Sequence, residues 1–182
     1  ASRGLGDVYK RQVNMAREGT TKDNNLLPPA LSDIVVNVPD HTYIPEEYVP
    51  DTDERVLYYR KIASADEVEV VDALQEELIV KHGEMPPATI NLFEKARLKA
   101  LANQHGIKTI SVTGGKVVVD PITVSRSFAS SLRRRGGRYL EDKKKLTVPL
   151  RIIGESDDGS TLTAIYAYIA HLFDEEVDKR KS

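Results

Sequence analysis

The sequence predicts an α+β domain in which a cluster of helices packs on a small, mostly antiparallel sheet. Helical and strand periodicities occur in separate groups along the chain and give the order β-ααα-ββ-α-ββ-α. Glycine turns rather than crossover helices separate most of the short strands, which is typical of hairpins. The length of 182 residues and a hydrophobic content of 40% suit one domain with a real core.

Composition excludes several classes of protein. The 26 basic and 28 acidic residues give a net charge of −2, which argues against a dedicated nucleic-acid domain, since such domains are usually basic. Cysteine is absent, which excludes disulfides and thiolate metal sites and favours a cytoplasmic location. No segment has the roughly 18 consecutive apolar residues of a membrane span, so no membrane partner is expected.

The two ends of the chain differ from its middle. Residues 1–12 show neither helical nor strand periodicity and are interpreted as a non-native leader. Residues 13–31 are polar and then interrupted by prolines, as in a linker. Residues 32–178 are predicted to form the single domain, and residues 179–182 a short tail.

The domain is predicted to begin with a strand and an extended loop. Ile34–Val38 is rich in β-branched residues, which favours a strand. Three prolines within residues 39–50 prevent both a helix and a central strand. We expect Tyr43 and Tyr48 to anchor this loop.

Three helices are expected next. Asp51 and Glu54 have the spacing of a capping box, which predicts that a helix starts at Asp51. Ser64 and Glu67 repeat that spacing before a second helix, which ends near His82-Gly83. A third helix is predicted from Pro86-Pro87 to His105-Gly106. The buried stripe of the second helix is predicted to contain Val68, Val71, Leu74, Leu78 and Ile79.

The second half changes to strand periodicity. Gly114-Gly115 predicts a hairpin, because both turn residues can take positive φ. Asp120-Pro121 is expected to cap a fourth helix that Gly136-Gly137 ends. Alternation over residues 145–152 predicts another strand, which Pro149 would place at a sheet edge. The last helix is predicted to bury Leu162, Ile165, Tyr166, Ile169, Leu172 and Phe173.

No set of residues in the sequence predicts catalysis, and no cofactor or metal is expected. The four histidines lack metal-ligand spacing, and His82 and His105 precede glycines at helix ends, where they suit the helix dipole. The stretch TGGK at residues 113–116 lacks the spacing of a phosphate loop and is followed by a strand. Without a nucleophile, base and orienting group, an enzyme is not expected.

One basic segment has two open interpretations. Residues 133–145 contain seven basic and two acidic residues, a net charge of +5. They could contact phosphates, with Tyr139 available for stacking on bases, or they could form a solvated helix end. The basic side chains are Arg133, Arg134, Arg135, Arg138, Lys143, Lys144 and Lys145.

The stretch EEYVPDTDERVLYYRKIASA, followed by LQEELIVKHGEMPPATINLFEKARLKALANQHGI, resembles the C-terminal domain of bacterial transcription-repair coupling factors. The motifs cover residues 33–107, and element order extends the resemblance to residue 182. It implies that residues 13–31 connect to an upstream motor region. It also implies that the parent protein is an ATP-dependent DNA translocase of nucleotide-excision repair, which contacts DNA and RNA polymerase, whereas this part is not itself an enzyme.

The resemblance further implies a regulatory role. The family domain docks on the UvrB-like N-terminal module of the same protein, hides the surface that binds UvrA and restrains the motor. The family's docking residues fall on Glu77, Val80 and Lys81, where valine replaces an aspartate and lysine an arginine. We expect these three to project from the polar side of the second helix, so that alanine at Glu77 and Lys81 would barely affect the fold.

Arg55 and Arg97, which lie within apolar helix faces, are interpreted as structural residues that snorkel or satisfy carbonyl groups. An accessory nucleic-acid-binding module that uses the basic segment remains the alternative function.

Overall fold

A computed structural model describes residues 33–157 and 159–181, with side chains up to Glu175. The predicted leader and linker therefore lie outside the described residues. The predicted order of elements is confirmed, with one short helix added. The elements are β1 (Val35–Asn37), α3 (Thr52–Ser64), α4 (Val68–His82), α5 (Pro87–His105), β2 (Thr109–Thr113), β3 (Lys116–Asp120), α6 (Arg126–Arg134), β4 (Arg138–Leu140), β5 (Lys145–Pro149), α7 (Leu150–Ile153) and α8 (Thr161–Lys181).

The five strands form one mixed sheet in the order β1-β2-β3-β5-β4. Strand β1 pairs with β2 in parallel, and the other three pairs are antiparallel. Val36, Ile110, Val119 and Leu146 lie next to one another across four strands and are all buried. The sheet therefore buries one face, as the period-two alternation requires.

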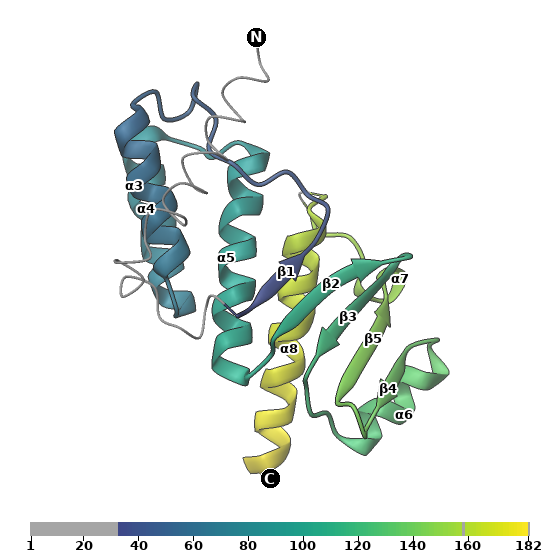
Figure 1. Cartoon of the computed structure of the whole chain (residues 1–182). Coiled ribbons are helices and arrows are strands. Elements are labelled where there is room, and N and C mark those ends of the chain that lie inside the picture. Colours follow the sequence, from purple (N-terminus) through teal and green to yellow (C-terminus); the bar gives the residue numbers. More distant parts are fainter. Residues whose placement is uncertain (1–32, 158, 182) are drawn as a thin grey trace.

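Helix α5 lies between two hydrophobic cores (Figure 1). Leu98, Leu101 and Ala102 contribute to the core between the sheet and α8. Phe93 and Ala96 contribute to a second core with α3 and α4. Helices α3 and α4 therefore join the sheet mainly through α5, with Val68 of α4 also packed against the sheet core. They lie at the opposite end of the molecule from β4 and α6 (Figure 1).

The position of Pro149 corrects a prediction. Strand β5 lies between β3 and β4 rather than at an edge. Proline is tolerated because β4 pairs with β5 only as far as Thr147, so no β4 residue lies opposite Pro149. The alternation predicted to continue to residue 152 also ends here, because Leu150–Ile153 form helix α7.

Two predicted helix starts are wrong. Helix α4 starts at Val68 with Glu67 as an N-cap that makes no side-chain bond, and the Ser64 hydroxyl instead donates to the Lys61 carbonyl. Helix α6 is capped by Ser125, whose hydroxyl oxygen accepts from the Phe128 N–H. Asp120, the expected cap, is the last residue of β3.

The extended loop is held differently from expectation. Tyr43 is 50% exposed, whereas Ile44 and Val49 are buried. Tyr48 does act as an anchor, because its hydroxyl donates to the Gly83 carbonyl over 2.6 Å. The Gly114-Gly115 hairpin is confirmed, with φ values of 59° and 73°.

Because α5 serves both cores, damage to either core should weaken the whole domain. We expect Phe93→Ala to cost about 3–5 kcal/mol and Leu98→Ala about 2–5 kcal/mol of unfolding free energy, each within a single transition. Denaturant unfolding followed by circular dichroism measures both, with the exposed Gln104→Ala on α5 as control. Two separate transitions in either variant would contradict the shared role of α5.

Candidate protein-docking face

Helix α3 begins with a cap and a buried arginine. The Asp51 carboxylate accepts hydrogen bonds from the Asp53 and Glu54 N–H groups over 2.8 and 3.2 Å, so the predicted cap is confirmed. Arg55 is only 1% exposed and donates to the Val49 carbonyl over 2.7 Å. The guanidinium satisfies carbonyls of the turn that precedes α3, as predicted, and is structural.

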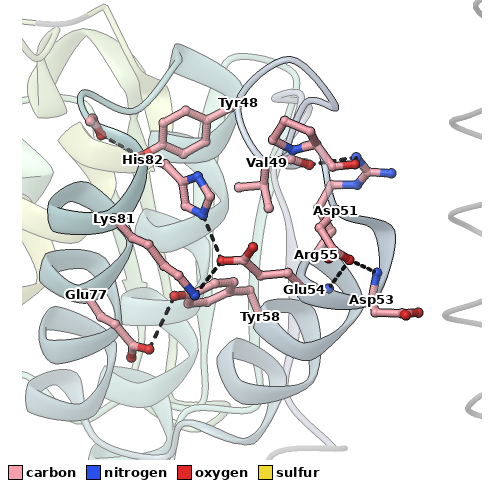
Figure 2. Close-up of polar contacts among 12 residues, drawn as sticks. Tyr48, Val49, Asp51, Asp53, Glu54, Arg55, Tyr58, Glu77, Lys81 and His82 are labelled. Atoms are coloured by element: carbon pink, nitrogen blue, oxygen red, sulfur yellow. Dashed lines mark hydrogen bonds and ion pairs between the residues drawn. The ribbon is translucent and has the colours of Figure 1, made fainter.

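A polar cluster joins α3 to the end of α4 (Figure 2). Glu54 Oε1 lies 2.8 Å from His82 Nε2 and 2.9 Å from Lys81 Nζ. The His82 ring also lies near the Tyr48 ring, with 5.9 Å between centroids. His82 therefore binds a side chain of α3, whereas the sequence predicted only an interaction with its own helix end.

One turn earlier on α4, Glu77 makes a second link to α3. Its Oε1 accepts a hydrogen bond from the Tyr58 hydroxyl over 3.3 Å (Figure 2). The same oxygen lies 3.8 Å from Lys61 Nζ. Tyr58 is 2% exposed, so its ring belongs to the core and its hydroxyl reaches the surface.

These contacts shift the ionisation of three groups. Hydrogen bonds from His82 and Lys81 lower the pKa of Glu54 below its ordinary value of 4.5. The hydrogen bond to Glu54 raises the pKa of Lys81. Burial raises the pKa of Tyr58, and the Glu77 carboxylate raises it further. Glu54 and Lys81 therefore both favour their charged forms in the folded domain.

Three apolar residues accompany Glu77 on the exposed surface of α4. Val70, Ala73, Glu77 and Val80 follow the helical spacing i, i+3, i+7, i+10, and all four are exposed. Val80 is 88% exposed and Val70 41%. We call these four residues with Lys81 the α4 face. It presents apolar surface around two charged side chains that are already held by α3.

The structure thus places the three predicted docking residues together. The expectation that Glu77 and Lys81 make no contacts important to the fold needs correction. Glu77 and Lys81 both contact α3, so alanine at these positions would remove contacts between helices. Val70 and Ala73 were missed by the sequence reasoning. The sequence signal that could have found them is the helical spacing of Val70, Ala73 and Val80, which places them on a different side of α4 from the buried stripe. Ile79, assigned to that stripe, is 38% exposed.

Arg97 is also structural but has different partners from those expected. It donates from Nε to Asp72 over 2.6 Å and from Nη1 to Glu94 over 2.7 Å, and it also contacts Gln75. These partners are side chains rather than backbone carbonyl groups. Since Asp72 and Gln75 belong to α4, Arg97 joins α5 to α4.

The basic segment lies at the other end of the molecule from the α4 face (Figure 1). It forms the end of α6, the strand β4 and the turn into β5. Six of its seven basic residues are exposed, and Lys145 is half-buried. Tyr139 does not offer a free ring, because it packs against the sheet core and its hydroxyl donates to the Ile122 carbonyl over 2.7 Å.

The described residues build neither a metal site nor a membrane span. No group of three metal-binding side chains comes together in this part of the chain. Among the described helices, none combines the length and apolar content needed to cross a bilayer. His105, the other helix-end histidine, stacks on Phe173 with 3.5 Å between ring centroids, and burial lowers its pKa.

The fold defines an α+β domain with a helical layer beside a sheet that buries one face. A profile of the TRCF domain matches residues 38–128. The chain therefore belongs to the TRCF domain family, the C-terminal domain of transcription-repair coupling factors. The predicted resemblance and fold class are confirmed.

Individual relatives agree with this assignment. Transcription-repair-coupling factor of Haemophilus influenzae is 33% identical over 104 residues, which are 57% of this chain and 9% of that protein. The Bacillus subtilis protein is 25% identical over 165 residues, 84% of this chain and 13% of its own length. The chain thus spans about a tenth of these relatives.

A crystal structure of the C-terminal domain of a transcription-repair coupling factor has the same fold. Its TM-score is 0.56 at 18% identity, and the match covers 75% of this chain and 95% of that one.

The polar cluster predicts a pH-dependent contribution to stability. The lowered pKa of Glu54 means that the unfolded chain takes up a proton first as pH falls. The stabilisation is therefore present above the ordinary value of 4.5 and is lost as pH falls through the folded-state value. We expect Glu54→Gln to lower the melting temperature near neutral pH, by an amount that shrinks towards about pH 3.

Thermal unfolding at a series of pH values measures this difference, and Glu76→Gln, an exposed carboxylate on α4, is the control. A difference between wild type and Glu54→Gln that is constant across the range would show that the Glu54 charge does not stabilise the fold.

Proposed function

We propose that this chain is the regulatory domain of a transcription-repair coupling factor and acts by docking on the UvrB-like N-terminal module of the same protein. Docking would hide the surface that binds UvrA and restrain the motor. The parent would be the ATP-dependent DNA translocase of transcription-coupled nucleotide-excision repair, which acts on DNA and stalled RNA polymerase. This chain supplies the docking surface and not the motor.

The exposure of Val80 carries the proposal. An 88% exposed valine lies beside Glu77 and Lys81, at a position where the family resemblance places a docking residue. Single exposed apolar residues are common, but Val70 and Ala73 extend this one along the same side of α4. An apolar patch with charged side chains at its border is the pattern of a protein interface, which has an apolar centre and a polar rim.

The contacts to α3 support docking, because they hold the two charged side chains in place before a partner arrives. Side-chain ordering on binding usually costs about 0.5–1.5 kcal/mol per residue. The Lys81–Glu54 and Glu77–Tyr58 contacts reduce that cost in advance. The side chains of Lys81 and Glu77 are still 57% and 49% exposed.

Charge indicates the kind of surface that fits. Residues 33–105, which include the whole α4 face, contain seven basic and fifteen acidic residues, a net charge of −8. A partner surface with basic side chains around an apolar centre would be complementary, and complementarity raises the rate of association. Regulation then follows as a population shift between docked and released arrangements.

Val80→Asp is the most direct change to the α4 face. The substitution places a carboxylate at the most exposed apolar position of the α4 face, where the side chain is 88% exposed. We expect affinity for the isolated N-terminal module to fall at least about tenfold, or about 1.4 kcal/mol. Calorimetric titration measures the affinity, and thermal unfolding should show stability unchanged within about 0.5 kcal/mol.

Gln104→Asp is the matched control, because it introduces the same side chain at an exposed site on α5. Equal affinities of wild type and Val80→Asp at unchanged stability would show that the α4 face is only solvated.

We also expect the purified chain to hydrolyse no ATP, with or without DNA. Residues 114 and 115 form a hairpin turn between two strands, whereas a phosphate loop requires a helix N-terminus. A phosphate-release assay measures this, with Lys116→Ala as the comparison that separates the chain from a contaminant. Turnover that disappears in Lys116→Ala would contradict the assignment.

A further inference from the structure

Charge is strongly separated between the two ends of this domain. Residues 106–154 contain eleven basic and three acidic residues, a net charge of +8, against −8 for residues 33–105. The positive part forms β2 to β5 with α6 and α7, and the negative part forms the edge strand β1 and helices α3 to α5 (Figure 1). The overall charge of −2 therefore conceals a basic surface.

The basic side chains at this end are available to a ligand. Arg133, Arg134, Arg135 and Arg138 are exposed, as are Lys143 and Lys144. Among the side chains that the structure describes, none of the seven cations of residues 133–145 forms an ion pair with a carboxylate. The helical end differs, because there Lys81 and Arg97 are both paired.

The open face of the sheet continues this surface. Thr147 of β5 pairs with Val118 of β3 on one side and with Arg138 of β4 on the other. These residues alternate with the core-facing ones along each strand and therefore belong to the opposite phase, on the open face of the sheet. Pro149 of that phase is buried, and the other residues of the phase in β2, β3 and β5 are half-buried or exposed. They include Thr109, Ser111 and Lys116, together with one carboxylate, Asp120. The face therefore offers hydroxyl groups and cations, the side chains that usually contact phosphate and sugar.

We propose that this basic surface, made of the 133–145 segment and the open face of β2, β3 and β5, binds the phosphate backbone of duplex nucleic acid. Sequence-independent contact is expected, because the surface consists mainly of cations and hydroxyl groups on strands and on the turn into β5, and such groups usually contact phosphate and sugar. A single strand is a poorer fit, since such sites stack bases on aromatic rings. Tyr139, the aromatic residue of the segment, faces the core.

This inference does not depend on the docking proposal. The surface lies at the opposite end from the α4 face, so both could be occupied together (Figure 1). The region of this chain that matches the family profile ends at residue 128, before the basic segment. Non-specific binding of this kind usually has a dissociation constant of about 10⁻⁴–10⁻⁶ M at physiological salt.

Fluorescence anisotropy of the full chain with a labelled duplex of about 20 base pairs tests the proposal. We expect equal affinity for two unrelated sequences. The logarithm of the binding constant should fall linearly with the logarithm of salt concentration, and the slope should become shallower by about 0.9 for each phosphate contact removed. Lys143→Gln with Lys144→Gln should weaken binding and reduce the slope by about 1.8. Arg60→Gln with Lys95→Gln, which changes net charge equally at the helical end, should have a much smaller effect.

Each contrary result overturns the proposal. Absence of binding at low salt, or equal weakening by both double variants, would show that the basic surface is not the site. Preference for a single strand would contradict the duplex assignment. Tighter binding of polyglutamate than of the duplex would assign the surface to an acidic protein instead. Strong preference for one duplex sequence would contradict backbone recognition.

Discussion

The burial of α5 on two sides is the constraint on which the rest of the structure depends. The helix supplies Phe93 to one core and Leu98 to the other, so the helical end and the sheet are built on a single element. Arg97 lies between these contacts and bonds to Asp72 on α4, which fixes α4 relative to α5. The position of the α4 face therefore follows from α5, although no residue of that face contributes to the sheet core.

Separation of the two ends gives the domain two chemically different surfaces. At the helical end, the charged groups near the α4 face are tied to one another, as Glu54 is to His82 and Lys81. At the sheet end, the cations of residues 133–145 form no ion pair with any carboxylate that the structure describes, and six of the seven are exposed. A paired surface suits a specific protein contact, because its side chains are ordered beforehand. An unpaired basic surface suits a polyanion without a fixed register.

Sequence reasoning succeeded where local chemistry decides the structure. The Asp51 cap and the Gly114-Gly115 hairpin depend on neighbouring residues, and the structure confirms both. The predicted buried face of α8 is confirmed at Leu162, Ile165, Ile169 and Leu172, whereas Tyr166 and Phe173 are half-buried. Sequence reasoning failed where tertiary contacts decide. The inner strand β5 tolerates Pro149 only because β4 is too short to pair with that residue. Glu77 and Lys81 bond to side chains of a different helix, α3, which the periodicity of α4 alone does not reveal.

Hydrogen–deuterium exchange of the full chain, with and without the UvrB-like N-terminal module of the parent protein, tests the central claim most directly. The docking account predicts added protection in α4 around residues 70–81, with the 133–145 segment unchanged. Such a pattern would place the contact at the helical end. Protection confined to the basic segment, or no change at saturating module, would contradict docking through the α4 face.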